Sequence, residues 1–97
     1  MPGDRFASVW DAIEDTHQDA ENMRLRSQLM MAITRHIESN SLRQADAAKI
    51  FGVTQPRVSD LVRGKIALFS LDTLVNMLSA AGIHIKFSVE QAHREMA

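Results

Sequence analysis

The sequence predicts an all-α bundle of about five helices, followed by one β-strand near the C-terminus. Apolar residues recur at helical spacing over most of the 97-residue chain, and glycines at positions 52, 64 and 82 separate the apolar segments. The apolar period changes to two only after Gly82. The length suits one domain, which we expect to span residues 1–97.

Two helices are expected before residue 40. A short turn of helix over residues 6–13 carries an apolar patch formed by Phe6, Val9, Trp10 and Ile13. A long helix over residues 18–38 follows, capped by Thr16 or Asp19. Its buried stripe repeats every four residues and consists of Leu25, Leu29, Ile33 and Ile37, with Met30 beside it.

The next expected helix covers residues 42–51. Ser41 and Gln44 have the spacing of a capping box, in which each side chain satisfies a free backbone donor. The helix is expected to bury Leu42, Ala45 and Ala48, and Gly52 ends it with a left-handed backbone.

A helix of similar length is expected over residues 54–63. Thr54 is a good N-cap, and Pro56 lies in the first turn, where its missing N–H costs nothing. Gly64 ends this helix. The inward stripe is formed by Val58, Leu61 and Val62, which leaves the N-terminal outer face polar.

A fourth major helix and a strand complete the predicted fold. Ser70 caps a helix over residues 71–81 that buries Leu71, Leu74, Val75 and Leu78. Residues 83–89 alternate as a strand with one apolar face, formed by Ile83, Ile85, Phe87 and Val89, and a tail follows at 90–97. A single strand needs a partner. We expect antiparallel pairing with the same strand of a second copy; the alternative is pairing within the chain, near the N-terminus.

The charge is unevenly distributed along a chain whose net charge is −1. Residues 42–65 carry five basic side chains against two acidic ones, whereas residues 1–41 carry seven acidic against four basic. A basic window within a near-neutral chain is typical of a surface that binds a polyanion. An uneven but merely solvated surface is the alternative.

Composition argues against several function classes. Cysteine is absent, which excludes disulfides, thiolate metal sites and cysteine nucleophiles. The four histidines are scattered without ligand spacing, and no acidic pair has the partners that catalysis needs. The apolar runs are far shorter than the roughly 20 residues that span a bilayer. We therefore expect a cytoplasmic, non-enzymatic protein with no catalytic residue, metal, cofactor or membrane partner.

The two short helices around Gly52 have the layout of a helix-turn-helix. Residues 42–65, LRQADAAKIFGVTQPRVSDLVRGK, resemble this motif in the Xre (Cro/repressor-like) family, and the segment FSLDTLVNMLSAAG resembles the family's next helix. The matching positions are Gln44, Ala47, Ala48, Gly52, Val53, Thr54, Val58, Ser59, Leu61, Gly64 and Lys65. The resemblance covers about residues 24–82 and implies a lambda-repressor-like bundle that binds double-stranded operator DNA.

The resemblance also implies which residues contact DNA. The base-reading positions are Gln55, Pro56, Ser59 and Asp60, whose side chains suit contacts in the major groove. The phosphate-contacting positions are Arg43, Gln44, Thr54, Arg57, Arg63 and Lys65. Asp60 fits this face only if it finds a donor, because a bare carboxylate is repelled by phosphate.

The C-terminal strand and the acidic N-terminus are similar to those of HigA-like antitoxins, which are often encoded beside a RelE-like ribonuclease toxin. This resemblance implies an autorepressing antitoxin that acts as a homodimer. Acidic residues within 4–21, with Phe6, Val9 and Trp10, are then expected to form or adjoin the toxin-binding surface. The alternatives are a stand-alone or phage-derived repressor without a toxin, and a protein-interaction module that no longer binds DNA.

Overall fold

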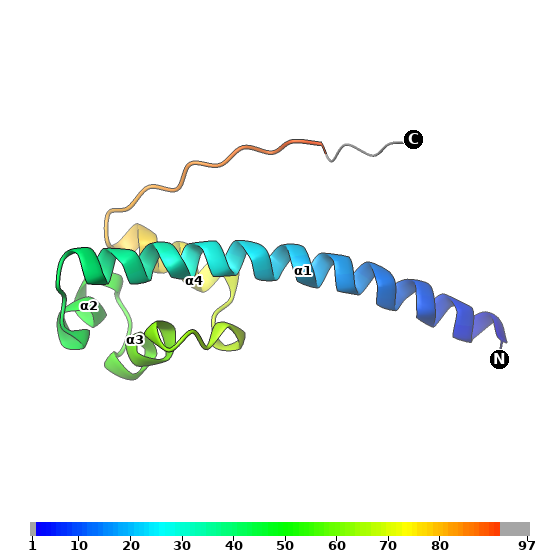
Figure 1. Cartoon of the computed structure of the whole chain (residues 1–97), viewed down its shortest axis with the longest axis horizontal. Helices are drawn as coiled ribbons and strands as arrows, with labels where there is room; N and C mark the ends of the chain where they lie inside the picture. Colours follow the sequence, from blue (N-terminus) through cyan, green and yellow to red (C-terminus); the bar gives the residue numbers. More distant parts are fainter. Residues whose placement is uncertain (1, 92–97) are drawn as a thin grey trace.

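The chain is arranged as one long helix with three shorter helices packed against its C-terminal half (Figure 1). The computed structural model describes residues 2–91, and the side chains of residues 18–91. The α-helices are α1 (Pro2–Ser39), α2 (Gln44–Phe51), α3 (Gln55–Val62) and α4 (Leu71–Ala80), and a 3₁₀ turn, η1 (Ile66–Leu68), lies between α3 and α4. The expected helical bundle is therefore confirmed.

Helix α1 runs without interruption where two separate helices, over 6–13 and 18–38, were expected. Thr16 and Asp19 lie inside it, so neither caps a helix start. Residues 4–39 include no glycine or proline. The polar residues between the two expected helices tolerate a helical backbone, so they do not end the helix. A helix of 38 residues is about 57 Å long, which accounts for the 55 Å longest dimension of the molecule. Its N-terminal half extends beyond the other helices (Figure 1).

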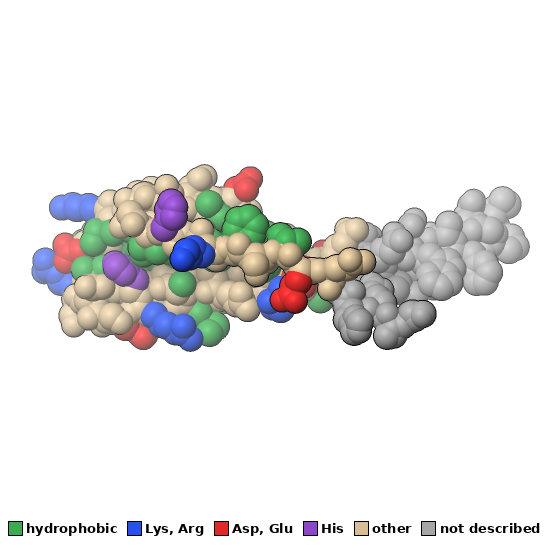
Figure 2. Space-filling model, turned by 90° about the horizontal axis from the view of Figure 1, so that it is seen from above, with side chains coloured by type: hydrophobic (Ala, Val, Ile, Leu, Met, Phe, Trp, Pro, Cys, Tyr) green, Lys and Arg blue, Asp and Glu red, His purple; other side chains and the backbone are tan. Residues whose placement is uncertain are grey.

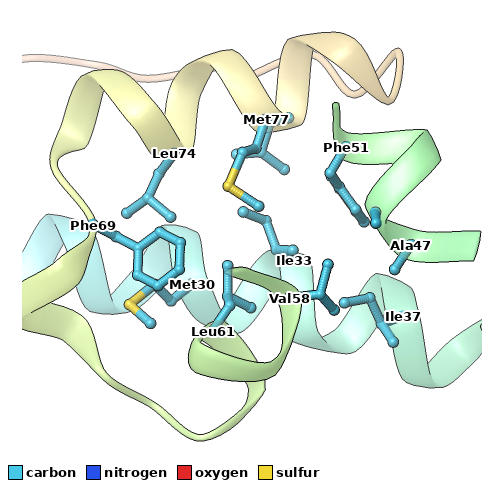
Figure 3. Close-up of a cluster of buried hydrophobic side chains, with 12 residues drawn as sticks. Met30, Ile33, Ile37, Ala47, Phe51, Val58, Leu61, Phe69, Leu74 and Met77 are labelled. Atoms are coloured by element: carbon cyan, nitrogen blue, oxygen red, sulfur yellow. The ribbon is translucent and has the colours of Figure 1, made fainter. Parts of the chain in front are cut away.

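The hydrophobic core lies between the C-terminal half of α1 and the three shorter helices (Figure 3). Ile33 of α1 and Leu74 of α4 are completely buried within it. The other buried side chains are Met30, Ile37, Ala47, Ala48, Phe51, Val58, Leu61, Phe69, Met77 and Leu78. No polar or charged residue is buried among the residues whose side chains are described. Burial of apolar surface is thus what holds the short helices against α1.

Helix α2 begins two residues later than expected, and the expected capping box at Ser41 and Gln44 is wrong. Ser41 adopts a left-handed backbone, with φ of 50°, and helps to end α1 instead. The N–H of Leu42 donates to the carbonyl of Ile37 at 2.9 Å, which closes the last turn of α1. Arg43 is the N-cap of α2, and its side chain makes no capping hydrogen bond.

Four residues expected in the core are exposed: Leu25 of α1, Ala45 of α2, Val62 of α3 and Val75 of α4. Leu42 and Leu71, also expected there, are half-buried. Each short helix contacts the core through a narrow stripe, so residues at the stripe's edge remain in solvent. In contrast, Phe69, which lies outside any helical pattern, is buried in the core.

Residues 83–91 form no strand in the described chain, so the predicted strand over 83–89 is absent from the single molecule. The segment is extended and runs beside α1 (Figure 1), and its last recorded backbone hydrogen bond joins Ile83 N–H to Leu78 O at 2.9 Å. Since no other strand occurs among residues 2–91, the segment finds no partner within that part of the chain.

The apolar face of this segment is divided in two. Ile83 and Ile85 are half-buried and pack against the core, whereas Phe87 is 82% and Val89 86% exposed. On the face of the molecule shown in Figure 2, exposed hydrophobic side chains lie among charged ones of both signs. The second half of the predicted strand face thus remains uncovered in the single chain.

Candidate nucleic-acid interface

A tight turn joins α2 to α3. Gly52 has φ of 69°, and its N–H and that of Val53 both bond to the carbonyl of Ala48. Thr54 then begins α3 with an extended backbone, as expected. Helix α2 packs against both α3 and α4, so α3 is held across the end of the bundle. This arrangement is a helix-turn-helix, and the predicted start and stop residues of its second helix are confirmed to within one residue.

The two faces of α3 differ in burial. Val58 and Leu61 are buried against the core, whereas Thr54, Gln55 and Pro56 are exposed at the start of the helix. The other two predicted base-reading residues, Ser59 and Asp60, are half-buried. The start of α3 is therefore accessible, and it carries two polar side chains, those of Thr54 and Gln55, beside the ring of Pro56.

Asp60 has the donor that its position requires. Its Oδ1 lies 3.5 Å from Nζ of Lys65, in the loop that follows α3. The pair brings together a predicted base-reading residue and a predicted phosphate-contacting residue. Each charge partly offsets the other at the surface.

The starts of α2 and α3 leave backbone donors uncapped by side chains. Neither Arg43 nor Thr54, the two N-caps, makes a side-chain capping bond, whereas Ser70 of α4 accepts from Thr73 N–H at 3.2 Å. Free N–H groups at a helix start favour an anion. Arg43 instead pairs with Asp46, with 3.2 Å between Nε and Oδ2, and Gln44 is exposed beside it.

Arg57 differs from the other predicted phosphate-contacting residues. Its Nη1 donates to the carbonyl of Leu68 at 3.1 Å, and its guanidinium lies 5.0 Å from the centre of the Phe69 ring. The residue is half-buried, whereas Arg63 and Lys65 are exposed. The structure thus brings Arg57 to the turn between α3 and α4.

Comparison with protein families gives a match to a model described as a helix-turn-helix domain, over residues 12–90. The chain belongs to this helix-turn-helix family. It is also similar to a solved structure named as an XRE-family transcriptional regulator, with 32% sequence identity and a TM-score of 0.71. That match covers 81% of this chain and 89% of the other. No match is found among the curated proteins.

This helix-turn-helix protein is therefore a DNA-binding transcriptional regulator of the XRE type. The resemblance seen in residues 42–65 is confirmed, and the family match extends it through the C-terminal segment to residue 90. The HigA-like subgroup is not distinguished by these comparisons.

Sequence reasoning on the helix-turn-helix protein missed one side chain that contacts the turn after α3. Arg26 of α1 donates from Nη1 to the carbonyls of Ile66 at 3.0 Å and Phe69 at 3.4 Å, and its Nε bonds to Asn22 at 2.6 Å. Its targets are backbone atoms some 40 residues further along the chain. Backbone carbonyls carry no sequence signature, so no local pattern could have identified this contact.

Two further observations concern the described part of the helix-turn-helix protein. Its residues include no group of three or more His, Cys, Asp or Glu side chains placed to hold a metal ion. None of its described helices combines the length and the apolar character needed to cross a bilayer.

Proposed function

We propose that this regulator is a sequence-specific repressor, a single DNA-binding domain over residues 1–97, in which α3 is the recognition helix. Gln55, Pro56, Ser59 and Asp60 read base edges in the major groove. The observation that carries this proposal is the exposed first turn of α3, directly after the turn at Gly52, on a helix whose inner face is fixed in the core.

Phosphate contacts are proposed for residues around this helix: Arg43, Gln44, Thr54, Arg63 and Lys65. The support is the exposure of these side chains and the uncapped N-termini of α2 and α3. Such contacts position a protein on DNA without reading its sequence. Arg57 was included in this group by the family pattern, but its hydrogen bond to Leu68 favours a different role, considered below.

A homodimer is the proposed functional unit, formed by antiparallel pairing of residues 83–89 in two copies. The support is the exposed Phe87 and Val89 on a segment whose backbone has no strand partner within residues 2–91. Two-fold dimers of this class read half-sites about 34 Å apart, one turn of the DNA helix. Ile83 and Ile85, placed in the same interface by the sequence pattern, already contact their own core.

The dimer is tested by light scattering on a variant that spares these core contacts. We expect Phe87→Ser combined with Val89→Ser to convert a dimer into a monomer, because the two apolar side chains of the proposed interface are lost. Both side chains are exposed, so the variant should keep its core. Met31→Ser, at another exposed apolar position, is the control and should stay dimeric. A wild-type monomer, or a double variant that remains dimeric, would refute the proposed interface.

Within this class, we favour an autorepressing antitoxin of a type II toxin–antitoxin pair, acting in the cytoplasm with a RelE-like toxin. The support is the excess of acidic residues in 1–41 and the projection of the N-terminal half of α1 beyond the bundle (Figure 1). A basic ribonuclease would be attracted to such a helix. The proposed contact residues are Phe6, Val9 and Trp10, and their side chains are not among those that the structure describes.

DNase footprinting tests DNA binding on the region upstream of the protein's own gene. We expect protection of two inverted half-sites about one helical turn apart. No protection on this region, together with no duplex selected from a random pool, would leave a protein-interaction module as the remaining reading.

The antitoxin role needs a separate test, because a stand-alone repressor would give the same footprint. The product of the adjacent gene is co-expressed with the full chain and with a chain that lacks residues 1–18. We expect only the full chain to retain it. Retention by the shortened chain would show that residues 1–18 do not form the binding surface.

A further inference from the structure

Two arginines from different helices hold the carbonyl groups of one short turn. Arg26 of α1 donates to Ile66 O at 3.0 Å and to Phe69 O at 3.4 Å. Arg57 of α3 donates to Leu68 O at 3.1 Å. Three carbonyls of the segment 66–69 therefore accept hydrogen bonds from guanidinium groups. Ile66 O also accepts from Phe69 N–H within the turn, and cationic donors suit the carbonyl end of a helical turn.

Phe69 is the apolar anchor of the same turn. Its ring is buried in the core, and the guanidinium of Arg57 lies 5.0 Å from the ring centre, within the range of a cation–π contact. Arg57 thus contacts the turn twice, once through a carbonyl and once through a ring. Because Arg57 lies in the first turn of α3, its side chain ties the start of the recognition helix to the segment that follows its end.

Besides the buried ring of Phe69, the turn is held by the packing of Ile66 against the core and by backbone hydrogen bonds within the turn. A three-residue 3₁₀ helix is weak by itself, Ala67 and Leu68 are exposed, and Ile66 is only half-buried. The loop immediately before it contains Arg63 and Lys65, which we propose as phosphate contacts. The position of these two side chains therefore depends on how firmly the segment 66–69 is held.

We propose that Arg26 and Arg57 are positioning residues for the DNA interface: they hold the 66–69 turn and, through it, place Arg63 and Lys65 against the DNA backbone. This inference rests on the proposed function of α3 as a recognition helix. In this proposal the guanidinium of Arg57 bonds to the protein's own backbone and does not contact a phosphate. A planar guanidinium suits the two contacts of Arg57, because it can donate to Leu68 O in its plane while its face lies over the Phe69 ring, whereas a single ammonium group has no such face.

The test is Arg57→Lys in the full chain, since lysine keeps the charge but loses the planar group. The probe is a fluorescein-labelled duplex that the wild type has selected from a random pool, and anisotropy is followed as salt is raised. We expect affinity to fall about tenfold, because the hydrogen bond to a charged group that holds the turn is lost and binding must order the turn. The salt slope should not change, because the complex, once formed, makes the same phosphate contacts. Arg26→Lys should behave in the same way.

Amide hydrogen exchange gives a second readout that needs no DNA. The N–H groups of Leu68 and Phe69 bond to Lys65 O and Ile66 O within the turn. Their exchange should be about tenfold faster in both variants, because local opening becomes easier when the carbonyl contacts are lost. Arg24→Lys is the matched control, because Arg24 is an exposed arginine of α1 that pairs only with Glu21 in the described contacts.

The salt slope separates positioning from direct phosphate contact. Lys65→Gln should reduce the slope by about one, as expected for one lost phosphate contact, whereas Arg57→Gln should weaken binding and leave the slope unchanged. A slope reduced by about one in Arg57→Gln, or wild-type exchange and affinity in Arg57→Lys, would overturn the proposal. If the wild type selects no duplex, the proposed function fails, and the exchange rates still decide whether the arginines hold the turn.

Discussion

Asp60 and Lys65 form an ion pair between α3 and the loop that follows it, with 3.5 Å between Oδ1 and Nζ. On DNA, each of the two groups would have a competing partner: a phosphate for Lys65 and a base-edge donor for Asp60. Association with random-sequence DNA must therefore break or strain the pair without the compensation that a correct base supplies. The pair is thus suited to reduce binding to wrong sequences.

We predict that Asp60→Asn binds random-sequence duplex more tightly than the wild type, by roughly three- to tenfold at about 50 mM salt, because a repelling charge is removed and Lys65 is released. Anisotropy titrations measure this effect. Asp72→Asn changes the net charge equally on α4 and should leave binding almost unaffected. Equal binding by Asp60→Asn and the wild type would show that the ion pair has no influence on discrimination.

Gln55 is an exposed polar residue in the first turn of α3 and is one of the residues that we propose to read bases. We predict that Gln55→Ala weakens binding to the selected duplex by about 1–3 kcal/mol, the value of one bidentate base contact. Binding to random-sequence duplex should not change, and repeated selection should yield any base at one position. Gln28→Ala, on the exposed part of α1, is the control. An equal loss on selected and random duplexes would indicate a phosphate contact instead.

Gly52 is required by the backbone of the turn and not by lack of space. A Cβ at this position would lie 3.6 Å from Cβ of Ala80, an ordinary contact, but φ is 69°. We predict that Gly52→Ala lowers the free energy of unfolding by about 1–2 kcal/mol, measured in urea. Gly52→Asn should cost less, because asparagine tolerates the left-handed region. Equal costs for Ala and Asn would point to crowding against α4.

Met30 and Met31 are neighbours in sequence with opposite surroundings. Met30 is 5% exposed and lies in the core, whereas Met31 is 50% exposed. We predict that Met30→Ala lowers the free energy of unfolding by about 2–4 kcal/mol through a cavity, and that Met31→Ala changes it by less than about 0.5 kcal/mol. Urea unfolding of the two variants checks both values. A large cost at Met31 would mean that its face is covered in solution.

Local signals in the sequence predicted the helix-turn-helix well. Gly52 ends one helix, Thr54 begins the next and Ser70 caps α4, as expected from residues that act on their nearest backbone neighbours. Ser41 was misread because its environment is set by the end of α1 as well as by the start of α2. The continuity of α1 was missed for a related reason: a polar stretch resembles a break although its residues tolerate a helix.

Contacts between segments that are distant along the chain could not be predicted from the sequence. Which side of an eight-residue helix is buried depends on where its neighbours lie, so Ala45 and Val62 were wrongly expected in the core. Arg57 matched a phosphate position in the family pattern, yet its side chain reaches a carbonyl eleven residues away. The alternation of residues 83–89 marks an apolar face, but a strand forms only where a second backbone supplies hydrogen bonds.

The sequence by itself therefore determined the helices, the turn at Gly52 and the family, because these depend on residue type and spacing along the chain. The tertiary structure decided how Arg26, Arg57 and the Asp60–Lys65 pair are used, since their partners come from elsewhere in the fold. A guanidinium or carboxylate takes whichever partner the packed backbone brings within reach. That choice is made only when α1, α3 and the loop between α3 and α4 come together around Phe69.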